Sequence, residues 1–440
     1  MTTVTVDRPA ERVVTVWDES IWVYKGWILR LTRMRVALLA LTGIGVIAIL
    51  YRLAFGLGAA TNLTNEWPWG MWVWWDVMTG VALAGGGYST ALLVNFIGKE
   101  EWKPIERAAF LTSLIGYLLV CAGLFLDLGR WINVPKAAMV WKLNPHSVMF
   151  ELFFCVAGYT VVQIVEFGHI YIERVNKPRL AHILHKIYAP VLIVGVLLPC
   201  LHQSALGSLY VIAAGRLDPL WWSMLLPLFF LASSFYIGAS TVTAENVMSA
   251  KAHHRTPPWK ILRQMVTLAG MIMAVYGIAK VADLIARDQF YRLFEGSTQS
   301  ALWLIEVGFG VAIPAIIFLS PKLREQPRWI TTGATLAVLG VALNRANVVF
   351  TGMMAQADGA TYLPSLPETL ITVGIVAGGI LLYALVVDNF PILGEEEEGG
   401  ELARPESPAD AGDVSRSEPL VVQDPWARSR AAAGGGESTE

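Results

Sequence analysis

The chain has 440 residues, of which 55% are hydrophobic and only 15% are charged, and its formal net charge is −2. Soluble domains usually carry roughly 25% charged residues, so this composition excludes an ordinary soluble globular protein and favours an integral membrane protein. The near-zero net charge gives no sign of a nucleic-acid partner.

Apolar stretches of membrane-spanning length follow one another along most of the chain. A spanning helix needs about 20 mostly apolar residues. We therefore predict an all-α, polytopic membrane protein of about ten transmembrane helices, over residues 36–57, 70–97, 108–128, 146–168, 187–201, 219–247, 265–286, 301–320, 329–350 and 367–390.

The connecting segments differ in their content of Lys and Arg. With the N-terminus inside, the segments on that side hold twenty of these residues and those on the other side hold six. Short cytoplasmic loops retain positive charge, so this bias predicts that both termini are cytoplasmic. The expected location is a bacterial-type cytoplasmic (inner) membrane, with membrane lipid around the helices.

Both ends of the chain differ from the membrane part, residues 36–393. Residues 1–35 are polar and basic, without the apolar core of a cleavable signal peptide, and are expected to be a cytoplasmic segment. Residues 394–440 begin with the acidic run 395–398 and continue with Gly, Ala, Ser, Pro and charged residues. This composition predicts a disordered, acidic cytoplasmic tail, and the alternative is a tail that docks a partner.

Polar residues gather at one end of four consecutive predicted helices. Ionisable groups are costly inside a membrane, so each is a candidate functional residue. Under this topology they fall at the outer face: Asp76 in the second helix, Asp127 and Arg130 in the third, His146 and Glu151 in the fourth, and His202, Gln203 and Ser204 in the fifth. A bundle of these helices would bring them around one pocket.

Several of these residues also have structural interpretations. Asp127 and Arg130 are three residues apart and could form an ion pair at a helix end. His146 alone is more typical of a hydrogen-bonded structural histidine. His202 is a stronger candidate, because three hydrogen-bonding residues interrupt an apolar stretch there.

Charged residues elsewhere give weaker signals. Arg52 and Arg345 lie near predicted helix ends, where a long side chain can reach the headgroup region. Lys280 and Asp283 have the i, i+3 spacing at which opposite charges can neutralise each other.

Glu151, Tyr117 and Glu166 suggest a proton path. The two glutamates are separated by about 22 Å along one helix and lie within roughly 60° of the same face. Tyr117 falls mid-membrane on the neighbouring helix, so the three could relay protons across the bilayer. The alternative is that Glu166 lies at the headgroup level and is simply solvated.

Haem and metal sites are not expected from the sequence. A b-type haem needs histidines paired within helices, whereas the seven histidines all fall at predicted helix ends or in loops. No cluster of side chains has the spacing of metal ligands.

At these residues the chain resembles a known family. The likeness is to the NrfD/PsrC-like, quinone-interacting membrane subunits of respiratory oxidoreductases, and within them to the HybB-type integral membrane subunit of nickel–iron hydrogenases. It covers residues 20–393 and is carried by residues 52–58, Pro68-Trp69-Gly70 with Asp76, residues 127–130, 144–151, 202–209 and 362–364, and Glu368.

The resemblance implies a haem-free fold of ten helices with a menaquinone or ubiquinone site near the outer face. His202 and Asp76 would contact the quinone head, and Glu151, Tyr117 and Glu166 would carry its protons. The whole predicted quinone-binding set is Trp69, Gly70, Asp76, Asp127, Arg130, His146, His202 and Ser204. The implied partners are an extracytoplasmic, ferredoxin-like iron–sulfur subunit and a pair of catalytic subunits.

The function that we expect is the quinone-reactive membrane subunit of a multi-subunit oxidoreductase, with a nickel–iron hydrogenase favoured as the catalytic part. A sulfur-compound reductase or another reductase of the same family is the alternative. The alternative of another class is a secondary transporter, but such proteins usually place their sites near the bilayer midplane, not at the outer face.

Overall fold

The computed structural model describes residues 12–16, 19–24, 27–65, 67, 69–98, 100–137, 139, 144, 146–175, 178–213, 215–252, 256–354, 362–390 and 392. Within this part of the chain, ten helical spans are long and apolar enough to cross a membrane. The predicted polytopic, mainly helical fold with about ten transmembrane helices is therefore confirmed. The predicted tail, 394–440, lies outside the described residues.

Seven of the ten spans are single helices and three combine α-helical with π-helical segments. The single helices are α1 (Arg33–Phe55), α5 (Lys103–Asp127), α7 (Val148–Val175), α8 (Pro178–Ile212), α9 (Leu226–Ala252) and α10 (Trp259–Ala286), and α16 (Leu366–Asn389) closes the domain in the same way. The composite spans are η1 (Trp72–Thr79), α3 (Gly80–Leu83), α4 (Gly86–Ala91) and η2 (Leu92–Phe96); α11 (Thr298–Val307), η7 (Gly308–Ala312) and α12 (Ile313–Leu319); and α14 (Pro327–Ala346) with η8 (Asn347–Thr351).

 Helix α8 contains Pro190 and Pro199, each of which lacks a backbone N–H donor, yet it continues without a break.

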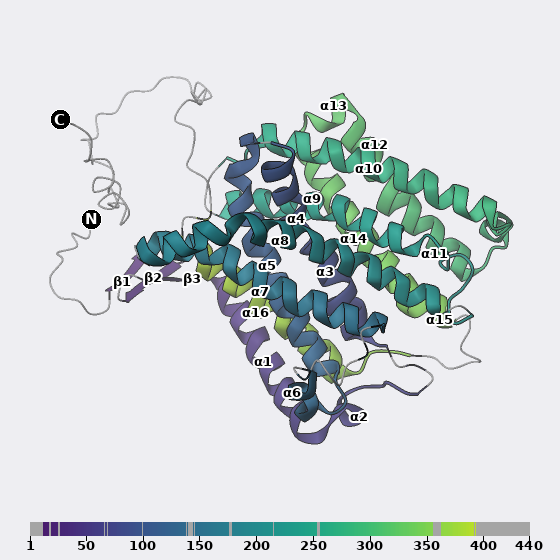
Figure 1. Cartoon of the computed structure of the whole chain (residues 1–440), viewed down its shortest axis with the longest axis horizontal. Helices are drawn as coiled ribbons and strands as arrows, with labels where there is room; N and C mark the ends of the chain where they lie inside the picture. Colours follow the sequence, from purple (N-terminus) through teal and green to yellow (C-terminus); the bar gives the residue numbers. More distant parts are fainter. Residues whose placement is uncertain are drawn as a thin grey trace, which may run out of the picture. The chain divides into compact units, whose positions relative to one another are not determined.

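Shorter elements connect these spans. They are α2 (Leu57–Ala60), η3 (Glu100–Trp102), η4 (Trp131–Asn133), α6 (Val134–Ala137), η6 (Phe290–Phe294), α13 (Pro321–Arg324) and α15 (Gly352–Met354). Figure 1 shows α2 and α6 near each other, at the end of α1 that lies away from the strands.

The first and last spans pack closely along each other. Helices α1 and α16 lie side by side (Figure 1). Gly45 and Gly374 face each other at the contact, where a Cβ built on Gly45 would lie 2.6 Å from the Cα of Gly374. Only glycine permits this approach of the two backbones, as at other close helix contacts in membranes.

A small antiparallel sheet precedes the helices and was not predicted. Its strands are β1 (Arg12–Val16), β2 (Glu19–Tyr24) and β3 (Trp27–Leu31), in the order β1-β2-β3. Short runs rich in β-branched and aromatic residues, separated by two residues each, are the signal of such hairpins. The predicted polar segment 1–35 contains this signal.

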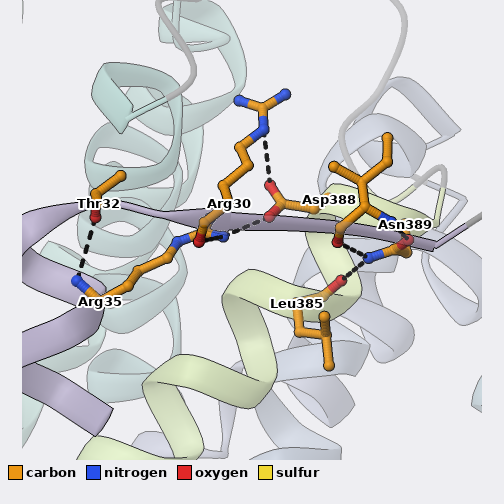
Figure 2. Close-up of polar contacts among 7 residues, drawn as sticks. Arg30, Thr32, Arg35, Leu385, Asp388 and Asn389 are labelled. Carbon is orange, nitrogen blue, oxygen red and sulfur yellow. Dashed lines mark hydrogen bonds and ion pairs between the residues drawn. The ribbon is translucent and has the colours of Figure 1, made fainter. Parts of the chain in front are cut away.

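Strand β3 is attached to the end of α16 (Figure 2). The Asn389 side chain accepts a hydrogen bond from the Ile28 backbone N–H at 2.7 Å and donates one to the Ile28 carbonyl at 2.8 Å. Arg30 and Arg35 both pair with Asp388, at 3.7 and 2.5 Å. We call this end of the helix bundle the sheet end, and the other the opposite end.

The helix that carries His202 is longer than predicted. The prediction ended it at residue 201, whereas α8 continues to Ile212. The hydroxyls of Ser204 and Ser208 donate to the carbonyls of Cys200 and Ser204 in the same helix, so these polar residues do not end it. His202 therefore lies about 15 Å before the end of α8 and not at its terminus.

Candidate functional site

His202 and Tyr117 form the centre of the candidate site. The Tyr117 hydroxyl in α5 lies 3.4 Å from Nδ1 of His202 in α8. The side chains are almost completely buried, with exposures of 0% and 1%. The other ring nitrogen of His202, Nε2, is buried and has no hydrogen-bond partner. A buried polar atom without a partner is costly, so Nε2 is suited to bind a ligand.

A chain of polar side chains leads from Tyr117 toward the sheet end. The Tyr117 ring packs edge-on against Tyr159 of α7, with centroids 4.5 Å apart. The Tyr159 hydroxyl lies 3.4 Å from that of Ser113, which accepts a hydrogen bond from the Gln163 amide at 2.6 Å. We call Tyr117, Tyr159, Ser113 and Gln163 the polar ladder.

Glu166 lies one helical turn beyond Gln163 on α7. Its side chain packs against Gly195 of α8, is only 4% exposed, and leaves Oε2 without a hydrogen-bond partner. This burial argues against the alternative that Glu166 is simply solvated at the headgroup level. Oε1 of Gln163 is also buried and unpaired. Two side-chain oxygens one helical turn apart, one on Gln163 and one on Glu166, are thus without a hydrogen-bond partner.

The sequence prediction missed Tyr159, Ser113 and Gln163. A signal was present, because Ser113 and Tyr117 are four residues apart on α5, as are Tyr159 and Gln163 on α7. Residues at this spacing share a helix face. Polar groups repeated in this way on an apolar helix indicate a buried polar contact with a neighbour.

Asp76 is buried near the opposite end of the bundle. It belongs to the π-helical segment η1, and the Thr372 hydroxyl donates to its Oδ2 at 3.3 Å. The Asp76 side chain packs against Gly123 of α5, where an added Cβ would lie 2.6 Å from the Asp76 Cβ. The π-helical turn and the glycine together bring a carboxylate close to α5.

Arg52 is buried within the protein, between the ends of α1 and α5. Its exposure is 0%. It donates from Nε to the Leu126 carbonyl at 2.8 Å and from Nη2 to the Leu128 carbonyl at 2.5 Å, on either side of Asp127. These are carbonyls at the end of α5 that lack partners within the helix. Arg52 thus fixes the backbone around Asp127.

The predicted ion pair between Asp127 and Arg130 is not formed. Arg130 is exposed, and no ion pair joins it to Asp127 among the described residues. Asp127 ends α5 and is half-buried. The turn after α5 separates the two side chains.

An aromatic layer covers the opposite end near Asp76. Tyr362 is stacked between Trp67 and Phe350, with ring centroids 6.1 and 5.6 Å apart. Its hydroxyl donates to Glu368 at 2.5 Å and accepts from the Met71 backbone N–H at 3.0 Å. Burial and the bond to Glu368 raise the pKa of Tyr362, so the phenol stays protonated and remains a donor.

The structure does not bring every predicted residue to this centre. His146 is exposed, and the carboxylate of Glu151, in the first turn of α7, has no hydrogen-bond or ion-pair partner among the described residues. The Ser204 hydroxyl donates to the carbonyls of its own helix. Trp69 packs edge-on against Tyr210, at 5.4 Å between centroids, and the adjacent Gly70 is buried against Tyr362.

Comparison with known proteins identifies the family. The profile described as "Polysulphide reductase, NrfD" matches residues 59–357. A protein of Nitratidesulfovibrio vulgaris is 32% identical over 80% of this chain and 92% of its own length. The "Probable Ni/Fe-hydrogenase 2 b-type cytochrome subunit" of Escherichia coli is 32% identical over 79% of this chain and 89% of its own. The "Menaquinone reductase, integral membrane subunit" of N. vulgaris is 27% identical over 87% and 93%.

The expectation of a chain without haem is wrong on this comparison. The E. coli relative is named a b-type cytochrome subunit, and that name implies a haem. Haem was not expected because every histidine was predicted to lie at a helix end or in a loop, where histidines do not pair as haem ligands. His202 instead lies inside α8, buried and with Nε2 unpaired. Such an imidazole is suited to serve as an axial ligand.

The family profile covers the middle two-thirds of the chain, and two relatives at 32% identity each match about four-fifths of it. The chain belongs to the NrfD family of integral membrane subunits.

Proposed function

We propose that this chain is the quinone-reactive membrane subunit of a respiratory oxidoreductase whose catalytic part is a nickel–iron hydrogenase. Its family makes it a quinone-interacting membrane subunit of an oxidoreductase complex. The hydrogenase is the finer part of the proposal, and the name of the E. coli relative supports it. The menaquinone reductase relative supports the alternative, another reductase with the same membrane subunit.

One observation carries the proposed site: a buried histidine with a free ring nitrogen. When the Tyr117 hydroxyl donates to Nδ1 of His202, the ring proton is on Nε2. Nε2 can then donate a hydrogen bond to a carbonyl oxygen of the quinone, which is menaquinone or ubiquinone. Reduction of that quinone takes two electrons and two protons, and the carbonyl oxygens become hydroxyls.

The polar ladder supports a route for these protons. Glu166 is the titratable group near its sheet end. Hydrogen bonds join Gln163, Ser113 and Tyr159, another joins Tyr117 to His202, and the two parts meet at the ring contact between Tyr159 and Tyr117. Hydroxyls can pass protons because each is both donor and acceptor. Asp76, held by Thr372, is the second carboxylate proposed to act on the quinone. Glu151 has the role of proton exchange at the opposite end.

The electrons have to come from outside the chain's own side chains. The proposed donor is an extracytoplasmic, ferredoxin-like iron–sulfur subunit docked at the opposite end, beside a catalytic subunit pair. A b-type haem, when bound, would supply one-electron transfer; if Nε2 of His202 held it, the same nitrogen could not donate to the quinone, so the two roles of His202 are alternatives. We place the complex in a bacterial cytoplasmic membrane with both termini of this chain inside, and residues 394–440 as a cytoplasmic tail.

The test is the cofactor content of the purified complex and of its His202→Ala variant. The proposal predicts quinone in stoichiometric amount in the wild-type complex and its loss in the variant, with all subunits still assembled. Pyridine haemochrome spectra of the same samples measure haem. Loss of haem with retention of quinone would assign His202 to a haem and contradict its role in the quinone site.

A further inference from the structure

A second buried charged cluster lies in α10, α11 and α14. Lys280 Nζ is 2.6 Å from Glu306 Oε1, and the side chains are only 8% and 2% exposed. The predicted pairing of Lys280 with Asp283 is not formed, since Asp283 pairs with Arg287 at 2.7 Å. A charged pair in the interior of a membrane domain is expensive and is a functional candidate by default.

Every recorded partner of the Glu306 carboxylate is a donor. Besides Lys280, it accepts from the Asn344 amide at 2.7 Å, the Trp221 indole at 2.8 Å and the Asn347 amide at 2.9 Å. Hydrogen bonds to the charged form stabilise it. Glu306 therefore remains an anion in this arrangement, and it is not the group that exchanges a proton.

Arg345 adds a second buried cation to the cluster. Its exposure is 0%, and its recorded partners are the oxygens of Asn344 and Ser233, each at 2.7 Å, and the face of Phe230 at 3.6 Å. No carboxylate pairs with it among the described residues. The cluster thus holds two cations and one anion. Since a guanidinium does not lose its proton in proteins, only Lys280 can remove the excess charge.

A small cavity borders Lys280 on the side of Asp283 and Arg287. Its volume of about 10 Å³ is near the space needed by one water, and Lys280, Asp283 and Arg287 are among its lining residues. Asp283 also accepts from Ser223 at 2.8 Å, and Arg287 is 20% exposed. A proton leaving Lys280 has a polar route in this direction.

The cluster is also tied to the segment that carries Asp76. The Trp74 indole in η1 donates to the Ala342 carbonyl of α14 at 3.0 Å, and its ring packs edge-on against Phe350 of η8 at 5.3 Å. Asn344 and Arg345 lie between these two contacts along the chain. A shift of η1 when quinone binds or is reduced would therefore reach the cluster.

We propose that Lys280 is a second proton-exchange site, separate from the polar ladder, which takes up and releases one proton per catalytic cycle through the cavity toward Asp283. The inference rests on the proposed quinone function, because binding or reduction of the quinone is what would shift η1 and change the surroundings of Lys280. On release, the ammonium gives one proton to the cavity water and becomes a neutral amine. Glu306 and Arg345 then balance each other's charge, and no electron is transferred.

The Lys280→Arg variant separates proton exchange from a structural ion pair. Arginine keeps the positive charge opposite Glu306 but cannot release a proton. In the whole complex, reconstituted in lipid vesicles, the variant is expected to keep the wild-type quinone turnover with an uncoupler present. It should release one proton fewer per quinone than the wild type. Lys322→Arg, at an exposed lysine, is the matched control.

Wild-type proton release by Lys280→Arg would overturn the inference, as would a wild-type complex that reduces quinone without net proton release. If the arginine variant does not assemble, Lys280→Met is the second variant, because it leaves Glu306 and Arg345 balanced and should show the same loss. An assembled methionine variant with wild-type release would also overturn the inference. Absence of any quinone turnover in the wild-type complex would instead contradict the proposed function.

Discussion

The Tyr117 hydroxyl lies 3.4 Å from Nδ1 of His202, in the solvent-shielded interior between α5 and α8. This contact sets which nitrogen of the imidazole is free to meet a substrate. Tyr117→Phe removes the hydroxyl and keeps the ring. Because positioned proton-transfer groups contribute about 10²–10⁴-fold, we expect quinone turnover to fall by about 100-fold. Steady-state rates measure this, and quinone content should stay at the wild-type level.

Tyr51→Phe, at an exposed tyrosine of α1, is the control for this change. Wild-type turnover of Tyr117→Phe would show that the hydroxyl has no part in the reaction.

Ser113 joins Tyr159 to Gln163 within the polar ladder. Ser113→Ala should interrupt proton delivery and lower turnover about 10-fold or more, as expected when a proton-transfer group is lost, while the quinone Kd is unchanged. The solvent deuterium isotope effect on turnover should rise, because proton delivery becomes rate-limiting. Ser240→Ala removes a buried hydroxyl that bonds only to its own helix at the Tyr236 carbonyl, and it should change neither quantity. Equal effects of the two substitutions would contradict the ladder.

Arg52 holds the end of α5 through two carbonyls. Hydrogen bonds from a charged donor contribute about 1.5–3 kcal/mol each, so Arg52→Gln should lower the stability of the protein by several kcal/mol and weaken quinone binding through displacement of Asp127. Thermal unfolding in detergent and quinone titration measure the two effects. Arg216→Gln, at an exposed arginine, is the control. A melting temperature of Arg52→Gln equal to that of the wild type would show that Arg52 does not stabilise the end of α5.

Tyr362 donates to the fully buried Glu368. Tyr362→Phe leaves that acceptor without one partner, at a cost of about 1–3 kcal/mol. The pKa of Tyr362 is raised above the ordinary tyrosine value of about 10. The stabilisation by the hydroxyl is therefore complete below pH 10 and is lost only as the pH rises further. The melting difference between wild type and variant should be constant from pH 6 to 9, and a difference that changes with pH in that range would argue against a protonated phenol.

Asn389 binds both backbone groups of Ile28, and Figure 2 shows this contact beside the Asp388 ion pairs. Asn389→Ala should release β3 from α16 and speed amide hydrogen exchange in residues 27–31, with quinone turnover within two-fold of wild type. Asn133→Ala, at the opposite end, should leave that exchange unchanged. Protection of β3 in Asn389→Ala equal to wild type would show that other contacts hold the sheet.

The ten spans could be predicted because hydropathy depends on each stretch of sequence alone. Asp76, Tyr117 and His202 could be chosen as candidates from sequence, since a polar residue within an apolar run is visible without its neighbours, and all three are buried in the structure. The end of α8 was wrong because Ser204 bonds within its own helix and therefore does not signal a terminus.

Contacts between helices could not be predicted in the same way. Hydropathy places Arg52 and Arg345 near helix ends. It does not show that Arg52 donates to a carbonyl of α5, or that Arg345 donates to a serine hydroxyl of α9. A transporter was disfavoured because His202 was predicted at the outer face. His202 lies well inside α8, so this reason no longer holds, and a transporter is now disfavoured because the chain belongs to the NrfD family.

Photolabelling of the intact complex with an azidoquinone tests the central claim most directly. The account predicts that the label is found on the α8 peptide around His202 and on the η1 peptide around Asp76, and that excess unmodified quinone prevents it. Labelling confined to α10, α11 and α14, with none around His202, would contradict the proposed quinone site.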